Sequence, residues 1–180
     1  MGYCTWAGMN EANRIYHDTE WGIPVHNDEK LYEMLLLEAF QAGLSWHVVL
    51  NKRENFRRAF DGFDAHKIAL YGEDKIESLL ADAGLIRCRR KIEGAIINAR
   101  CFLQIQQEFG SFIAYLDSFT GGVVTVNRTD ETFITSPLSD AISRDLRRRG
   151  MKYMGSVTVY SYLQAVGVIN DHMPGCFLHP

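Results

Sequence analysis

The sequence predicts an all-α protein, and two of its features carry that prediction. The pattern of polar and apolar residues is helical almost throughout the 180 positions. Glycine and proline interrupt the pattern at short intervals, and residues of the kind that cap helices precede most of the segments between them. Hydrophobic residues make up 47% of the chain, which is enough to bury a core, so we expect one compact unit over residues 1–180.

Short helices are expected one after another along the chain. In order, they span Glu11–Thr19 after Asn10, 29–42 after Asp28, 45–60 from Ser45, two short helices headed by Asp64 and Asp74 (the second ending at Gly84), 90–109, 111–119, 139–149 and 156–166. Residues 121–137 have strand-like composition, and we expect them to form an extended loop. The last dozen residues are expected to form an irregular tail.

The charge is distributed unevenly, although the chain as a whole is slightly acidic. The formal net charge is −3 and the pI about 6.1, which argues against a strongly basic nucleic-acid-binding domain. Basic residues nevertheless cluster over 52–58, 87–91 and 144–152. Folded onto one side, the three clusters would form a phosphate-binding face, whereas any single cluster is more simply a solvated helix face.

The cysteines and the hydropathy pattern bear on where the protein works. The four cysteines, at positions 4, 88, 101 and 176, contain no close pair that would suggest a disulfide framework. The chain shows no signal peptide and no apolar run long enough to span a membrane. We therefore expect a cytoplasmic protein with reduced thiols and no membrane partner.

One carboxylate interrupts an apolar face of the predicted 29–42 helix. The residues at helical spacing on this face are Leu31, Met34, Leu35, Glu38 and Ala42, and all but Glu38 are apolar. A carboxylate on a core-facing stripe must be paired, neutralised or exposed to a cavity. Two interpretations stay open: a helix-end side chain that reaches solvent or an arginine, and a functional acid in a pocket.

Aromatic residues gather near Glu38 in the sequence. Trp6, Tyr16, Trp21 and Trp46 lie in the first part of the chain, and they include all three tryptophans. Aromatic faces beside a carboxylate suit a flat cationic heterocycle, which they would bind by stacking, cation–π attraction and charge pairing. An aromatic-rich core is the alternative.

Both ends of the chain carry metal-ligand residue types. Cys4 and His17 lie near the start, and His172 and Cys176 near the end. Two sulfurs and two nitrogens suit tetrahedral zinc, and a full set without an open position would be structural. The spacing is not that of a zinc finger, so folding would have to join segments 1–25 and 165–180. By residue type alone His26, His47, His66 and His179 are equally available, and we expect these four on the surface.

Residues 82–92 are predicted to form a helix, a tight turn and a second helix. The turn starts at Gly84 and the second helix begins near Arg89 or Arg90. A helix N-terminus offers free N–H groups to a phosphate, and the basic side chains Arg87, Arg89, Arg90 and Lys91 would strengthen that binding. The alternative is an αα-hairpin that only packs.

Three strings carry a family resemblance. They are Cys4-x-Trp6, Tyr16-His17-Asp18-x-Glu20-Trp21-Gly22-x-Pro24 and Glu38-x-x-Gln41-Ala42-Gly43-Leu44-Ser45-Trp46. With the 82–92 hairpin, Arg147–Gly150 and Asn170–Cys176, they resemble the 3-methyladenine DNA glycosylase I family of the helix-hairpin-helix glycosylase superfamily. The resemblance covers nearly the whole chain.

This resemblance implies roles for the residues already singled out. It implies a structural zinc ion on Cys4, His17, His172 and Cys176. It also implies a base pocket in which Glu38, the catalytic residue, and Tyr16 hydrogen-bond the base while Trp46 stacks on it and Trp6 and Trp21 form walls. By analogy, Gly43 and Leu44 would wedge into the gap that a flipped base leaves in the duplex.

The implied activity is hydrolysis of the N-glycosidic bond of 3-methyladenine in alkylated double-stranded DNA, in base excision repair, by a monomer that flips the base out of the helix. Lys91 is expected to bind DNA and not to act as a nucleophile, so strand cleavage is not expected.

Two positions depart from the family pattern: Asn13 stands where the family usually has Tyr, and Asp117 where we expect Trp. The altered stretch around Asn13 keeps open a glycosylase for another alkylated base. A zinc-clipped DNA-binding module without catalysis is a further alternative. A serine hydrolase is disfavoured because Ser45 lacks the GxSxG spacing.

Overall fold

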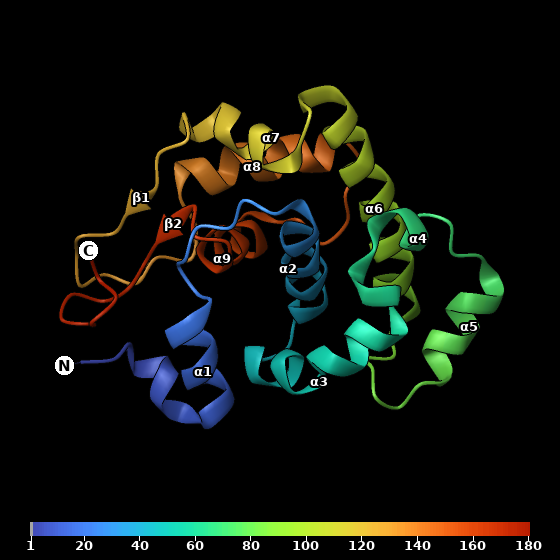
Figure 1. The fold of residues 1–180 in the computed structure, drawn as a ribbon, viewed down its shortest axis with the longest axis horizontal. Coiled ribbons are helices and arrows are strands. Elements are labelled where there is room, and N and C mark those ends of the chain that lie inside the picture. The colour runs from blue at the N-terminus through green and yellow to red at the C-terminus, as the bar shows by residue number, and fades with distance from the viewer. Residues whose placement is uncertain (1) are drawn as a thin grey trace.

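The structure is a computed structural model that describes residues 2–180, and it is helical almost throughout, as predicted (Figure 1). Met1, the first residue of the predicted unit, lies outside this description. The α-helices are α1 Glu11–Thr19, α2 Asp28–Gln41, α3 Trp46–Ala59, α4 Ala65–Ile68, α5 Glu73–Ala81, α6 Arg89–Phe109, α7 Phe112–Thr120, α8 Pro137–Arg148 and α9 Ser156–Ala165. Two 3-10 turns, η1 Thr5–Met9 and η2 Asp61–Phe63, and two short strands, β1 Thr125–Val126 and β2 Ile169–Asn170, complete the described elements. Within residues 2–180, none of the helices combines the length and the apolar character needed to cross a bilayer.

Helix α2 is the centre of the molecule. It contacts α3, α6, α7 and α9, which surround it in Figure 1. Its residues Leu31–Phe40 are all buried, so the helix is covered on every side. The sequence pattern had suggested a single buried face. Two of these buried residues, Glu33 and Glu38, are acidic, and both therefore need a partner or a cavity.

The predicted start of α1 is confirmed, whereas that of α2 is wrong by one residue. The Asn10 side chain accepts a hydrogen bond from the backbone N–H of Asn13. Helix α2 is capped by Asn27 and not by Asp28. Asp28 is used elsewhere: its carboxylate accepts hydrogen bonds from the backbone N–H groups of Phe112 and Ile113 at the start of α7. A capping side chain can thus serve a distant helix, which local sequence cannot reveal.

Other boundaries also differ from the prediction. Helix α5 begins after Gly72, not at Asp74, and it ends at Ala81, three residues before Gly84. Helix α8 begins at Pro137 instead of residue 139, because Ser136 and Ser139 form a capping box. The predicted loop 121–137 is extended, but it includes strand β1, which pairs in parallel with β2 of the tail.

The two ends of the chain lie side by side (Figure 1). Gly2 donates a backbone hydrogen bond to Gly175 O and accepts one from Phe177 N–H. Further along, Val25 N–H donates to Val166 O. This approach requires Gly167, since its φ is +71° and a Cβ there would lie 2.2 Å from the carbonyl carbon of Ile23.

Candidate active site and metal centre

A cavity of about 750 Å³ opens between α1, the end of α2, the start of α3, α9 and the 127–134 loop. Its lining includes Trp6, Tyr16, Trp21, Glu38 and Trp46, the five residues assigned to base binding from the sequence. They come from four separate elements and their flanks, yet folding brings all of them to one space. A cavity of this size holds a flat heterocycle.

The aromatic rings of the cavity are in mutual contact. The rings of Tyr16 and Trp46 lie 5.2 Å apart between centroids, and those of Trp6 and Trp21 lie 5.0 Å apart in an edge-to-face arrangement. Trp6 also lies 6.2 Å from Tyr16. The four rings therefore form one continuous wall, so that a base bound against Trp46 would be enclosed by Tyr16 and Trp6.

Glu38 is the buried carboxylate of this cavity. Its side chain is 4% exposed, and Oε2 has no hydrogen-bond partner. Burial raises the pKa of Glu38 to about 8, since the charged form is poorly solvated there. Asp171 also lines the cavity, but its oxygens accept hydrogen bonds from Asn127, Tyr160 and Gln164.

Glu33, five residues earlier on α2, shows the opposite behaviour. Its carboxylate accepts hydrogen bonds from Lys30, Arg53 and Arg57. Burial alone raises the pKa of Glu33, but these cations outweigh burial and lower it overall. Glu33 is thus a structural ion-pair residue that ties α2 to α3, whereas Glu38 is the buried acid of α2 whose Oε2 has no hydrogen-bond partner.

The cavity collects polar atoms that have no partner. Within residues 2–180, five buried side-chain nitrogen or oxygen atoms lack a hydrogen bond: Asn13 Oδ1, Tyr16 Oη, Glu38 Oε2, Trp46 Nε1 and His47 Nδ1. All five belong to residues that line this cavity. Burial, and secondarily Glu38, raises the pKa of Tyr16 well above its ordinary value, so its hydroxyl remains a donor. Unsatisfied buried polar groups are rare and costly, so their gathering in one place indicates a site for a polar ligand.

Two of the five residues with unpaired buried atoms were not assigned to the site from the sequence. His47 was expected on the surface, but it is half-buried in the first turn of α3 and lines the cavity. Asn13 was noted only as a departure from the family pattern, and it lies in the cavity wall beside Tyr16. The only sequence signal for His47 is its position next to Trp46. The second departure, Asp117, is exposed on α7 and does not line the cavity.

The other surface histidines behave mostly as expected. His26 and His66 are exposed. His179 is half-buried, because its Nε2 lies 3.1 Å from the carbonyl oxygen of Asn127 in the loop above the cavity. None of these three belongs to the four-residue Cys/His cluster described below.

The turn at Gly43 and Leu44 projects from the end of α2. Gly43 has a φ of +80°, which favours glycine, and the Leu44 side chain is 40% exposed. Lys91 supports this turn from behind: its ammonium donates hydrogen bonds to Phe40 O at 2.8 Å and to Ala42 O at 2.6 Å. The lysine thus satisfies carbonyls that the end of α2 leaves open, and its burial lowers its pKa.

We expect Lys91→Met to lower the free energy of unfolding by about 1–3 kcal/mol, because two carbonyls would lose a charged donor while the methylene packing is kept. The change is measured by urea denaturation. Arg90→Met is the matched control: Arg90 is exposed and has no side-chain partner within residues 2–180, so it should change stability by less than about 0.5 kcal/mol. Equal effects of the two variants would contradict this role of Lys91.

The α5–α6 hairpin is joined to α3. Gly84 O accepts hydrogen bonds from Lys52 Nζ at 3.1 Å and Asn55 Nδ2 at 3.2 Å. A Cβ on Gly84 would lie 2.9 Å from that Asn55 nitrogen, so the close approach requires glycine. Because α3 begins at Trp46, one helix carries both the cavity wall and the anchor of the hairpin, and Figure 1 shows α3 and the hairpin turn along one edge of the molecule.

The basic residues of the hairpin differ in availability. Helix α6 begins at Arg89, as predicted, but Arg89 forms ion pairs with Glu73 and Glu77 of α5. Arg87 and Arg90 are exposed, and neither forms an ion pair or side-chain hydrogen bond within residues 2–180. These two arginines are therefore the side chains of the hairpin that are open to a phosphate.

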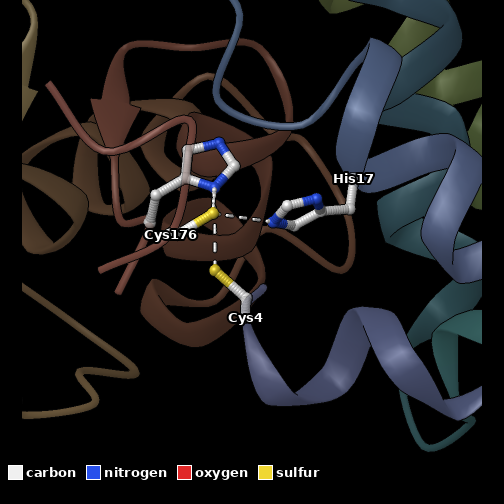
Figure 2. Close-up of side chains that lie close together, drawn as sticks. Cys4, His17 and Cys176 are labelled. Carbon is white, nitrogen blue, oxygen red and sulfur yellow. Dashed lines mark hydrogen bonds between the residues drawn. The ribbon is translucent and has the colours of Figure 1, made fainter. Parts of the chain in front are cut away.

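The four metal-ligand candidates from the two chain ends meet in the structure. Cys4, His17, His172 and Cys176 are all buried, and their ligand atoms lie within 4.8 Å of one another. Figure 2 shows Cys4, His17 and Cys176 converging from the N-terminal segment, α1 and the C-terminal tail. Cys176 Sγ lies 3.4 Å from His17 Nε2 and 3.6 Å from His172 Nδ1. Zinc–sulfur and zinc–nitrogen bonds of ordinary length give tetrahedral edges of about 3.5 Å, so the donors fit such an ion.

Neighbouring groups orient both imidazoles toward this centre. His17 Nδ1 lies 2.8 Å from Asp18 Oδ1, and His172 Nε2 lies 3.1 Å from Trp21 O. These contacts leave one nitrogen of each ring for a cation, as outer partners of metal-binding histidines do. Gly22 permits this arrangement, since a Cβ there would lie 2.9 Å from His172 Nε2. Four protein donors leave no open position, so the centre suits a structural role.

Comparisons with known proteins agree with this geometry. The family model described as methyladenine glycosylase matches residues 6–179. The DNA-3-methyladenine glycosylase 1 of Escherichia coli strain K12 is 42% identical over 183 residues, covering 100% of this chain and 98% of that protein. The DNA-3-methyladenine glycosylase of Haemophilus influenzae is 36% identical over 176 residues, covering 96% of this chain and 95% of that protein. A solved structure of a 3-methyladenine DNA glycosylase I variant in complex with 3-methyladenine has a TM-score of 0.95 and 30% identity, covering 100% of this chain and 98% of that one.

The fold and the sequence together define the class of protein as a helical glycosylase. Because the family model spans nearly the entire chain and two curated enzymes align with it end to end, the chain belongs to the methyladenine glycosylase family. The resemblance inferred from its motifs is therefore confirmed.

Proposed function

We propose that this protein is a monofunctional DNA glycosylase that hydrolyses the N-glycosidic bond of 3-methyladenine in alkylated double-stranded DNA, as the first step of base excision repair. The observation that carries the proposal is Glu38, a buried carboxyl group without a partner in a cavity walled by three tryptophans and a tyrosine. Relatives bearing the name of this activity span the whole chain, which supports it further.

The chemistry of the lesion matches this cavity. Adenine methylated at N3 is cationic while it is bonded to deoxyribose, and it leaves as a neutral base, so its departure needs little acid catalysis. Once the base is flipped out, Trp46 would stack on it and the Tyr16 hydroxyl would donate a hydrogen bond to it. The ionised Glu38 would pair with the cation and stabilise the electron-poor sugar as the bond breaks and water adds at C1′.

The raised pKa of Glu38 provides discrimination against undamaged bases. With a pKa of about 8, the carboxyl group of the empty cavity is mainly neutral at pH 7. A cationic base favours its ionisation, whereas a neutral adenine cannot compensate the desolvated charge. The cavity therefore binds the positively charged lesion in preference to the common base.

The position of Lys91 supports hydrolysis without strand cleavage. Its ammonium is held by the carbonyls of Phe40 and Ala42, and it does not line the cavity. An amine that forms a Schiff base with the sugar must reach C1′, and no lysine lines the cavity in the part of the chain that the structure describes.

The proposal includes a structural zinc ion held by Cys4, His17, His172 and Cys176, which cross-links the two chain ends. Burial raises the pKa of Cys4 to about 11 in the absence of a cation, and a bound cation supplies the charge that stabilises its thiolate. We further propose a monomer that works in the cytoplasm, where the four unpaired cysteines stay reduced.

Release of free base tests the proposal. Methylated duplex DNA is incubated with the zinc-loaded protein, and the released bases are separated by chromatography. We expect 3-methyladenine, with strand breaks appearing only after alkaline treatment. A folded, zinc-loaded protein that binds DNA but releases no base would support a binding module instead, and release of a different alkylated base alone would replace the proposed substrate.

Contacts with the DNA backbone are proposed for the hairpin and the 43–44 turn. The exposed Leu44 would enter the gap left by the flipped base. Gly84 and the backbone of Arg89 at the N-terminus of α6 would face the phosphates, together with the side chains of Arg87 and Arg90. Lys91 would contribute to DNA binding indirectly, by holding the 43–44 turn in place.

We expect Arg87→Ala and Arg90→Ala each to lower the slope of log Kd against log salt concentration by about 1, because each variant loses one phosphate contact. The slope is measured by fluorescence anisotropy on duplex DNA between low and moderate salt. Arg147→Ala on α8, which lies across the molecule from the hairpin (Figure 1), is the control and should leave it unchanged. An unchanged slope in the hairpin variants would exclude them from the interface.

A further inference from the structure

We infer that Asn13 determines base specificity in the cavity: its Oδ1 accepts a hydrogen bond from the exocyclic amine of the bound base. This inference rests on the proposed function and extends it to a residue outside the carboxylate and aromatic set. It is based on the orientation of the amide, its missing partner and the chemistry of the base.

The orientation of the Asn13 amide follows from its neighbours. Its Nδ2 donates a hydrogen bond to Trp6 O at 3.3 Å. In the opposite orientation, two carbonyl oxygens would face each other without a proton between them, so the amide nitrogen belongs on the Trp6 side. The backbone N–H of Asn13 is also fixed, because it donates to Asn10 Oδ1 at 2.9 Å. The side chain is thus held in one position before any ligand binds.

The Oδ1 atom of this oriented amide has no partner. Asn13 is 5% exposed, and its Oδ1 is one of the five unpaired buried atoms that gather at the cavity. Leaving a buried carbonyl oxygen without a donor costs about 1–3 kcal/mol. Since the backbone and Nδ2 contacts already anchor the residue, the free oxygen has no structural task, and a ligand donor would satisfy it.

The unpaired atoms divide into donors and acceptors that suit an aminopurine. Tyr16 and Trp46 offer an O–H and an N–H, whereas Asn13 and the ionised Glu38 offer oxygens. His47 Nδ1 donates or accepts according to the tautomer of its ring. Two acceptors need two N–H groups from the ligand. In 3-methyladenine the only N–H groups are the two of its exocyclic amine, and the ring nitrogens accept. The Oδ1 atom of Asn13 therefore favours an alkylated purine with an exocyclic amine, and its neutral amide adds no charge to the cavity that Glu38 also lines.

The test compares two free bases that differ only in this amine: 3-methyladenine and 3-methylpurine. Binding is followed by tryptophan fluorescence, because all three tryptophans line the cavity. Asn13→Leu preserves the size of the side chain and removes the acceptor. We expect it to weaken 3-methyladenine binding by about 3- to 10-fold, the effect of one neutral hydrogen bond, and to change 3-methylpurine binding by less than about twofold.

Each alternative gives a different pattern. An equal loss for both bases would show that Asn13 acts only by holding Trp6, and no loss for either base would leave it without a role; both outcomes overturn the inference while the wild type still releases 3-methyladenine. A wild type that neither binds nor releases 3-methyladenine would overturn the proposed function itself. Asn13→Ala serves for the same comparison if the leucine variant does not fold.

Discussion

Glu38→Gln is expected to reduce the release of 3-methyladenine by about 100- to 1,000-fold while the protein stays folded, because the amide keeps the shape of the side chain but cannot pair with a cationic base or stabilise the developing positive charge. Single-turnover release from methylated duplex DNA, resolved by chromatography, measures the effect. Release at the wild-type rate would keep the proposed activity but remove Glu38 from the chemistry.

The pH dependence of the same variant provides a second readout. The pKa of Glu38 in the free enzyme is raised to about 8 by burial, so the carboxylate fraction grows as pH rises through that value. We expect kcat/KM of the wild type to increase toward pH 8 and then level off. Glu38→Gln should lack this limb. A limb that persists in the variant would belong to another group.

Whereas kcat/KM should rise toward pH 8, the stability of the folded protein should fall over the same range. Because folding raises the pKa of this carboxyl group from an ordinary value of 4.5, the folded state binds more protons than the unfolded chain between pH 4.5 and 8. The contribution of Glu38 to stability is therefore lost as pH rises through this window. The glutamine variant should be free of that loss, so its thermal midpoint should exceed that of the wild type at pH 8.

Glu33→Gln is the matched control on the same helix. It removes the ion pairs of this buried carboxylate with Arg53 and Arg57. Arg53 keeps Glu20 and Arg57 keeps Glu54 as partners, so the change should cost about 1–3 kcal/mol of stability. The Glu33→Gln variant should keep the rise of kcat/KM toward pH 8. Loss of the limb in both variants would indicate that it reports unfolding and not the ionisation of Glu38.

The different environments of Glu33 and Glu38 could not be predicted from the sequence. Helical periodicity placed Glu38 on a buried face, but it could not show that α2 is buried on all sides or that Glu33 is buried as well. The distinction depends on arginines of α3, about twenty residues away in the chain, that neutralise one acid and do not reach the other. Such distant pairing leaves no local pattern.

Helix positions followed from local chemistry where the capping residue acts locally. Asn10 and Asp64 cap the helices that follow them, as predicted. Asp28 caps a different helix, and the 121–137 loop gains a strand only because the tail lies beside it. His47 looked like a surface residue until α3 turned it toward the cavity. Tertiary contacts decided each of these cases.

Residue type alone also left the metal ligands undetermined. Six histidines and four cysteines were available. Their places near the two chain ends suggested the four that the structure brings together, and the family resemblance strengthened that choice. The chain ends had to be adjacent for this centre to form, and the hydrogen bonds between Gly2 and the 175–177 segment meet that condition.

Cys176→Ser is expected to abolish metal binding and to lower the free energy of unfolding by about 5 kcal/mol. The reason is that the centre joins Cys176 to His17, 159 positions apart, and the entropy of closing so long a loop has this magnitude. In a domain of this size the loss corresponds to a fall of roughly 10–20 °C in Tm. Calorimetry gives Tm, and elemental analysis gives the metal content.

Cys88→Ser is the control that separates the metal centre from thiol loss in general. Cys88 is half-buried at the start of α6 and outside the cluster, so it should keep one zinc per chain and a nearly unchanged Tm. A Cys176→Ser protein that retained its zinc, or lost it without a change in Tm, would contradict the cross-link.

Loss of the metal centre should also weaken base binding, since Trp21 lies between the two sites. Its ring centroid is 4.6 Å from that of His172 on one side and 5.0 Å from that of Trp6 on the other. When the tail is released, Trp21 loses the imidazole against which it packs, and Trp6 loses the neighbour that holds it over the cavity. We therefore expect Cys176→Ser to weaken 3-methyladenine binding at a temperature where the variant is still folded, and Cys88→Ser to leave binding unchanged. If binding survived zinc loss in the folded variant, the metal would support the fold alone and the cavity wall would be held by the other aromatic rings.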